Sequence, residues 1–140
     1  MIHYQENQLT PDVLNTVRIA VGWNSYPLLQ LKRAIQCTVY SVTAWEEDQP
    51  VGIARLTGDG IYYLLCDVAV IPAAQKQGIG RHMVQRLIDL AHQGLADGER
   101  ASIVLVSANG KEPFYASLGF SAIPNAKAGY GMQLFLTAEN

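Results

Sequence analysis

A glycine-rich turn, QKQGIGR at residues 75–81, contains the residue types needed to bind an anion. The apolar run DVAVIP precedes it at residues 67–72, and HMVQRLIDLAHQ follows at residues 82–93 with apolar side chains at helical spacing. The sequence therefore predicts a strand, a turn and a helix in direct succession. The first N–H groups of a helix have no intrahelical partner and carry partial positive charge, so a helix start of this kind can bind phosphate.

Four residues of the turn strengthen this interpretation. Gly78 and Gly80 have no Cβ atom, so phosphate oxygens can approach the main chain closely, and Lys76 and Arg81 add full positive charge. The phosphate-binding pattern GxxxxGK[ST] is absent, and the dinucleotide pattern GxGxxG would need a glycine where Met83 stands. The turn is therefore predicted to hold one pyrophosphate of another ligand, unless it is an ordinary strand-to-helix connection that uses two glycines.

The composition predicts one globular domain over residues 1–140. Hydrophobic residues make up 49% of the chain, charged residues 16%, and the net charge is −2. Because the sequence has neither a polybasic run nor an apolar run of about 18 residues, we expect neither nucleic acid nor a membrane as a partner. The N-terminal residues are polar and acidic where a signal peptide needs a basic start, which favours a cytoplasmic location. Cys37 and Cys66 fall in apolar runs and are expected to be buried, without a disulfide.

The remaining sequence predicts a mixed α/β fold around the strand–turn–helix segment. Two helices are expected near the N-terminus, one that begins with TPD at residues 10–12 and one that begins with SYP at residues 25–27. A third helix follows the glycine turn, and a short fourth helix covers residues 112–118. Hairpins followed by a strand–helix–strand unit give a mixed, mostly antiparallel sheet flanked by helices. Strands are expected at residues 2–5, 37–45, 51–57, 61–71, 102–107, 120–123 and 133–137.

The segment VAVIPAAQKQGIGR, residues 68–81, resembles the acetyl-coenzyme A signature of the GNAT superfamily of N-acetyltransferases. That signature joins an apolar strand to the pattern Q/R-x-x-G-x-G/A at the start of a helix, and here it reads Gln75-x-x-Gly78-x-Gly80. A second segment, FYASLGF at residues 114–120, resembles the family's FYxxLGF pattern. The predicted element order is similar to that of the family over essentially all 140 residues. The resemblance implies a GNAT-like acyl-CoA N-acyltransferase fold with acetyl-CoA as co-substrate.

The resemblance also implies which residues bind the cofactor. In the family, the strand before the glycine turn diverges from its parallel neighbour, and the acyl group enters the resulting cleft. The main-chain groups of Val68, Ala69 and Val70 would then face the pantetheine arm and the acetyl group. Asn109 lies one residue out of phase with a family asparagine, so it either contacts the cofactor or shapes a turn with Gly110. The residues implied to wrap the pyrophosphate are Gln75, Lys76, Gln77, Gly78, Ile79, Gly80 and Arg81.

Transfer of an acetyl group from a thioester to an amine needs a neutral amine, a donor for the oxyanion and a proton for the departing sulfur. The main-chain N–H near Val70 would serve the oxyanion. The resemblance implies a general acid at Tyr115, whose alternative role is packing beside Phe114. Many relatives carry a glutamate where this chain has the strand SIVLVS, so the base stays open between Asp67 and a water relay. The sequence has no metal-ligand spacing, and no metal is expected.

The resemblance builds the acceptor site from residues 22–27 and 123–132. Trp23, Tyr26 and Tyr130 in these segments would line an aromatic pocket or pack as core and lid. The preferred function is therefore N-acetylation of a small-molecule primary amine by direct attack in a ternary complex. A catalytically silent acyl-CoA sensor, a protein N-terminus or lysine as acceptor, and another acyl group such as succinyl remain alternatives. Exposed edge strands also leave a homodimer open.

Overall fold

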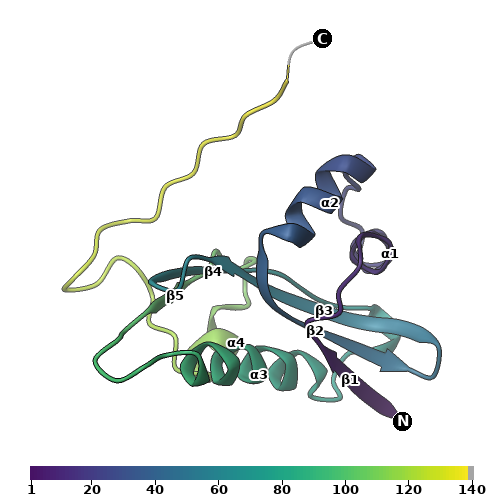
Figure 1. Ribbon diagram of the computed structural model, residues 1–140, viewed down its shortest axis with the longest axis horizontal. Helices are drawn as coiled ribbons and strands as arrows, with labels where there is room; N and C mark the ends of the chain where they lie inside the picture. The colour runs from purple at the N-terminus through teal and green to yellow at the C-terminus, as the bar shows by residue number, and fades with distance from the viewer. Residues whose placement is uncertain (139–140) are drawn as a thin grey trace. The chain divides into compact units, whose positions relative to one another are not determined.

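The computed structural model describes residues 1–138, and the chain divides into two compact units, Met1–Leu105 and Val106–Asn140. The first unit is built on a five-stranded sheet in the order β1-β2-β3-β4-β5 (Figure 1). Its first three strand pairs are antiparallel and its last pair is parallel, so the predicted mixed, mostly antiparallel sheet is confirmed. The single domain predicted over the whole chain stays a prediction. The strands are β1 (Ile2–Glu6), β2 (Thr38–Glu46), β3 (Gln49–Gly58), β4 (Tyr62–Val70) and β5 (Ser102–Val104).

Helices cover both faces of this sheet. They are α1 (Pro11–Ala20), α2 (Leu28–Gln36) and α3 (Ile79–Gln93), with a 3₁₀ turn, η1 (Pro72–Ala74), between β4 and the glycine turn. The first helix begins as predicted, because Thr10 Oγ1 accepts a hydrogen bond from Val13 N at 3.2 Å and Pro11 stands at the first helical position. In Figure 1, α1 and α2 lie on one side of the sheet and α3 lies on the other.

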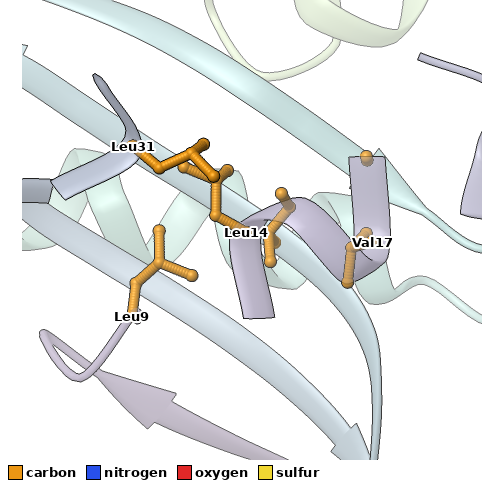
Figure 2. Packing of buried hydrophobic residues seen from close by; sticks show 6 residues of the cluster. Leu9, Leu14, Val17 and Leu31 are labelled. Carbon is orange, nitrogen blue, oxygen red and sulfur yellow. The ribbon is translucent and has the colours of Figure 1, made fainter. Parts of the chain in front are cut away.

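Aliphatic side chains fill the space between the sheet and the first two helices. The cluster comprises Leu9, Leu14, Val17, Leu31, Ile53 and Ala69. Figure 2 shows Leu9, Leu14 and Leu31 gathered in one place, although they come from three separate segments of the chain. Each fully buried side chain of this kind stabilises the fold by about 1.5–3 kcal/mol. The cluster therefore holds α1 and α2 against β4, the strand that contains the predicted acyl-binding segment, and against its neighbour β3.

The opposite face of the sheet is covered by α3, which packs on β2, β3 and β4. Its buried side chains follow the predicted helical spacing and are Ile79, Met83, Val84, Leu87 and Ala91. Gly52 of β3 allows close packing, because a Cβ atom there would stand 3.0 Å from Met83 Cε and 3.2 Å from Ile79 Cγ2. Gly52 also pairs with Val70, the last residue of β4. The start of α3 is thereby seated beside the end of β4.

The predicted strand at residues 102–107 and the predicted helix at residues 112–118 both exist in shorter form. The strand β5 ends at Val104. The helix α4 (Glu112–Ala116) lies in the second unit. Their positions agree with the sequence pattern, and the differences fall at the element ends, where hydrogen bonding frays.

The strands predicted at residues 120–123 and 133–137 are wrong. Within the described residues, neither segment pairs with a strand, and an isolated bridge joins Asn125 to Ala128 instead. An alternating apolar pattern gives a strand only where a neighbouring strand supplies hydrogen-bond partners and a surface to cover. The side chains at the second segment have no such cover, since Leu136 is 86% exposed.

The two cysteines differ in their surroundings. Both are free thiols. Cys66 lies in β4 but is only half-buried, so its predicted burial is met in part; Cys37 is exposed, and its predicted burial is wrong. The reason is that Cys37 follows the last turn of α2 instead of lying inside β2. In the part of the chain that the structure describes, no helix combines the length and apolar character needed to cross a membrane.

Candidate active site

A bulge interrupts the strand that leads into the glycine turn. Two residues of β4, Asp67 and Val68, stand opposite the single residue Ala54 of β3. Asp67 has φ +53°, in the left-handed region that few residues with a Cβ atom adopt. A bulge bends its strand and disrupts the local ladder of hydrogen bonds. The disruption includes Val68, the first of residues 68–70, whose main-chain groups are predicted to face the acyl group.

The strand β4 extends beyond its parallel neighbour. It continues to Val70, but its pairing with β5 ends where Leu64 stands opposite Val104. Within residues 1–105, no strand pairs with the β5-facing edge of residues 65–70. An open edge of this kind offers main-chain donors and acceptors to an extended ligand. Within the first unit, the edge of β4 at residues 65–70 is therefore unpaired, as an acyl-binding strand requires.

The glycine turn ends in a helix start without a side-chain cap. Gly78 is the N-cap residue of α3, has φ +78° and provides no side-chain hydrogen bond. The first main-chain bond of the helix runs from His82 N to Gly78 O at 3.0 Å, so the amides of Ile79 and Gly80 precede the ladder. A Cβ atom at Gly78 would meet no protein atom within 4 Å. The space at the side-chain position of Gly78 is therefore open.

The other residues predicted to bind the pyrophosphate lie along the same turn. Lys76, Gln77 and Arg81 are exposed, and Lys76 has φ +65°. Left-handed backbone at a lysine is strained, and such strain often marks ligand sites. The side chain of Gln75 turns back instead, because its Nε2 donates to Val70 O at 3.0 Å and so braces the turn against β4. The ligand contacts of all these residues stay predictions.

Two arginines enclose Asp67. Its Oδ1 accepts a hydrogen bond from Arg18 Nη1 of α1, and its Oδ2 accepts one from Arg55 Nε of β3 at 2.7 Å. The side chains of both arginines are 13% exposed and that of Asp67 is 10% exposed. Guanidinium groups therefore occupy both carboxylate oxygens of Asp67. The choice of base between Asp67 and a water relay stays a prediction.

The sequence pattern predicts neither arginine as part of the site, although one of them leaves a signal. Arg55 is the one cation in the apolar run VGIARLT, and a charge in a buried strand requires a partner. The position of Arg55 in the sequence therefore predicts an ion pair but does not identify the carboxylate that forms it. Arg18 leaves no comparable signal, because a cation on a surface helix is the common case.

The loop between α1 and α2 is tied to the same arginine. Arg18 Nε and Nη2 donate to Asn24 O at 3.2 and 3.0 Å. The guanidinium carbon of Arg18 lies 5.3 Å from the centre of the Trp23 ring and 4.8 Å from that of Tyr26. Two aromatic residues predicted for the acceptor pocket therefore stack on the protein's own cation while remaining partly exposed. Tyr130, the third, belongs to the second unit.

Tyr115 and Asn109 also belong to the second unit. The Tyr115 ring packs edge-on against Phe114 and Phe120, with centroid distances of 5.0 and 5.9 Å. Burial raises the pKa of the Tyr115 phenol, which makes it a weaker acid. Asn109 is exposed in a turn with Gly110, whose φ is +84°. The packing and turn roles are present, and the roles as general acid and cofactor ligand stay predictions.

Other features of the first unit do not compete with this site. A cavity of about 360 Å³ lies near the beginning of β4, away from the glycine turn, and is open to solvent. It is lined by residues of β3, β4 and β5 and the turn between β3 and β4, and it includes no residue of the glycine turn. Among residues 1–138, no group of three His, Cys, Asp or Glu side chains is arranged to hold a metal ion.

The chain resembles known acetyltransferases in sequence. The family model described as "Acetyltransferase (GNAT) domain" matches residues 37–122. GCN5-related N-acetyltransferase 1, chloroplastic, from Arabidopsis thaliana is 35% identical over 86% of this chain. Serotonin N-acetyltransferase 2, chloroplastic, from Oryza sativa subsp. japonica is 34% identical over 83% of this chain. The matches cover 61% and 58% of those two proteins, so this chain spans about three fifths of the length of the curated relatives it matches.

Solved structures share the fold. A probable acetyltransferase of unknown function from meticillin-resistant Staphylococcus aureus has a TM-score of 0.83 at 19% identity, covering 97% of this chain and 100% of that one. A GNAT family acetyltransferase from Brucella melitensis, in complex with acetyl-CoA, has a TM-score of 0.61 at 22% identity, covering 87% and 84%. At these identities the likeness establishes the fold alone.

Proposed function

Because the chain belongs to the GNAT family of acetyltransferases, we propose that it transfers the acetyl group of acetyl-CoA to the nitrogen of a small primary amine. The main support is the unpaired edge of β4 at residues 65–70. The glycine turn connects this strand to the uncapped start of α3. An open strand edge suits the extended, amide-bearing pantetheine arm, and the helix start suits the diphosphate. One strand–turn–helix segment would therefore bind both ends of the cofactor.

The reaction proceeds by direct attack in a ternary complex. The ammonium form of the acceptor first releases one proton to water, and the nitrogen lone pair then attacks the thioester carbonyl carbon. The new C–N bond leaves positive charge on the nitrogen and negative charge on the carbonyl oxygen, and this oxygen accepts a hydrogen bond from a main-chain N–H near Val70. The C–S bond then breaks. The nitrogen then loses its second proton, and the CoA sulfur gains one proton. The sulfur receives that proton from Tyr115 or from water.

Tyr115 can assist the departing sulfur without being essential. A phenol has a pKa of about 10 and a thiol about 8.5, so full proton transfer between unperturbed groups is uphill by roughly 2 kcal/mol. Burial raises the pKa of Tyr115 and so widens this difference. Water protonation of the thiolate is therefore the competing route, and the reaction does not depend on the tyrosine alone.

A covalent acyl-cysteine route is disfavoured at Cys66, the cysteine in the cofactor-binding strand. Burial raises the pKa of its thiol to about 11. Only the thiolate attacks a thioester, and at neutral pH about 10⁻⁴ of such a thiol is ionised. This favours direct attack by the amine over a two-step transfer.

A small aromatic amine fits the acceptor loop better than a flexible polyamine. Trp23 and Tyr26 are 40% and 48% exposed, and the Arg18 guanidinium stacks on both rings. The rings therefore offer exposed aromatic surface to an acceptor beside a positive charge. The rice relative is named a serotonin N-acetyltransferase, and serotonin is an aromatic primary amine, which supports the same class of acceptor here. A protein N-terminus or lysine is the second candidate.

An amine screen with detection of released CoA thiol tests the proposed function. The purified chain is incubated with acetyl-CoA and, separately, serotonin, phenethylamine, spermidine and a lysine-containing peptide. We expect turnover of serotonin and phenethylamine above that of spermidine. A raised thermal midpoint with acetyl-CoA, but no turnover of any amine, would favour the acyl-CoA sensor instead. The absence of both effects would reject acetyl-CoA as the ligand.

A further inference from the structure

The ion pairs at the β4 bulge leave a surplus of positive charge. Arg18 and Arg55 bring two guanidinium charges to the single carboxylate of Asp67, so this ion-pair cluster has a formal charge of +1. Among the described residues, no second carboxylate forms an ion pair with either arginine. All three side chains are largely shielded from water, so solvent screens the surplus charge only in part.

The ion-pair cluster lies between the two parts of the proposed site. On one side, Asp67 directly precedes Val68, at the roughly 3.8 Å that separates consecutive Cα atoms, so it adjoins the segment proposed to bind the acyl group. On the other side, Arg18 holds the acceptor loop through Asn24 O and the ring of Tyr26. An amine held by this loop and attacking an acyl group on β4 therefore stands beside the cluster.

We propose that the ion-pair cluster favours the neutral form of the bound amine and so partly takes the place of a general base. A net positive charge disfavours a second cation beside it, so the bound ammonium group releases its proton to water more readily. This inference rests on the proposed function, because it concerns the acceptor of the same reaction. The ion-pair cluster would thereby raise the neutral fraction of the amine, although arginines already bind both oxygens of Asp67, the carboxylate of the acyl-binding strand.

The other groups around the ion-pair cluster do not offset its charge. Cys66 neighbours it on β4, and burial raises the pKa of that thiol to about 11, so the thiol is uncharged at neutral pH. Tyr26 presents its ring to Arg18, and the hydroxyl of Thr38 accepts a hydrogen bond from Arg55 Nη1 at 3.2 Å. A unit charge about 10 Å from the amine, at an effective dielectric constant of about 20, corresponds to about one pH unit before salt screening.

The pH dependence of the single-turnover rate tests the proposal, with saturating acetyl-CoA and phenethylamine, an amine with no other titratable group. Such a profile reports the pKa of the ternary complex. Arg55→Met reduces the cluster charge to zero and should raise the apparent pKa by about half to one unit. Asp67→Asn increases the cluster charge to +2 and should lower the apparent pKa. Asparagine tolerates the left-handed backbone that Asp67 adopts. Arg55→Lys retains the charge and should keep the wild-type profile.

Arg86→Met is the matched control, because Arg86 pairs with Glu6 of β1 and lies on α3, on the opposite face of the sheet (Figure 1). Its profile should be that of the wild type. The proposal is overturned if Arg55→Met leaves the apparent pKa unmoved, or if Arg55→Lys shifts it equally. Loss of the acidic limb in Asp67→Asn would also overturn it, by making Asp67 the base.

The two Arg55 variants decide the question alone if Asp67→Asn does not fold. Active enzyme with unmoved profiles overturns this inference and leaves the proposed function standing. A wild-type protein that turns over no phenethylamine overturns the proposed acceptor class, and the inference falls with it.

Discussion

Replacing Gly78 by alanine tests whether the start of α3 binds the diphosphate of acetyl-CoA. Gly78 has φ +78°, and a Cβ atom there would meet no protein atom within 4 Å. The folded protein therefore bears only the cost of a left-handed residue with a side chain, about 1–2 kcal/mol. Gly78→Ala should consequently fold, with a thermal midpoint a few degrees lower.

The substitution should reduce the binding free energy of acetyl-CoA by more than it reduces the free energy of unfolding. The added methyl group would occupy the open space in which the proposed diphosphate approaches the amides of Ile79 and Gly80. A hydrogen bond to a charged group contributes about 1.5–3 kcal/mol, so losing one weakens binding by about 10-fold to 150-fold. Loss of both amide contacts would weaken it further.

Isothermal titration with acetyl-CoA measures this effect, and Gly98→Ala is a closely matched control. Gly98 lies in the turn after α3 and has φ +83°, and a Cβ atom there would likewise meet no protein atom within 4 Å. It should lower stability to the same extent and leave the dissociation constant unchanged. If folded Gly78→Ala binds acetyl-CoA as tightly as Gly98→Ala, the helix start does not hold the diphosphate.

Three further substitutions examine the acid, a turn and a surface ion pair. Tyr115→Phe should lower turnover about tenfold or more and leave acetyl-CoA affinity unchanged; an unaltered rate would reject the acid role. Gly58→Ala places a Cβ atom 2.1 Å from Tyr62 O and should destabilise the protein in urea by about 2 kcal/mol or more, whereas Gly60→Ala, in open space, should cost about 1 kcal/mol. Equal losses would contradict the turn packing. The side-chain hydrogen bond from Arg86 of α3 lowers the pKa of Glu6 below its usual 4.5. The pair therefore stabilises the fold above pH 4.5, and this stabilisation is lost as the pH falls below that value. Glu6→Gln should therefore lower the thermal midpoint at pH 7, and by progressively less as the pH falls below 4.5; a deficit of the same size in acid would contradict the ion pair.

Local signals were sufficient to predict the segment that positions the proposed cofactor site. The start of α1 follows from the side chain of Thr10, and the start of α3 follows from a glycine after a polar turn. Each depends on contacts within a few residues, which a sequence displays directly. The strands predicted at residues 120–123 and 133–137 depend instead on a partner far along the chain, and a local pattern contains no information about that partner.

The bulge shows a second limit of local reasoning. The run IYYLLCDVAVI predicts one continuous strand over residues 61–71, with Asp67 as its single acidic interruption. An aspartate inside such a run indicates either a catalytic carboxylate or a paired one, and the sequence does not distinguish them. The choice is made by Arg18 and Arg55, which lie 49 and 12 residues away and reach Asp67 only in the folded sheet.

The charge at this bulge is better explained by chemistry than by stability. Replacing a buried ion pair by apolar side chains of similar volume often leaves a protein equally stable or more so, because two charges lose their hydration on burial. A second arginine on one carboxylate adds another desolvated charge without another anion to neutralise it. Beside a thioester under attack, however, the same surplus favours the neutral amine before the C–N bond forms and favours release of the second proton from the cationic nitrogen after it forms. One buried positive charge would therefore act in the same direction at two successive steps, which a single carboxylate base would not do.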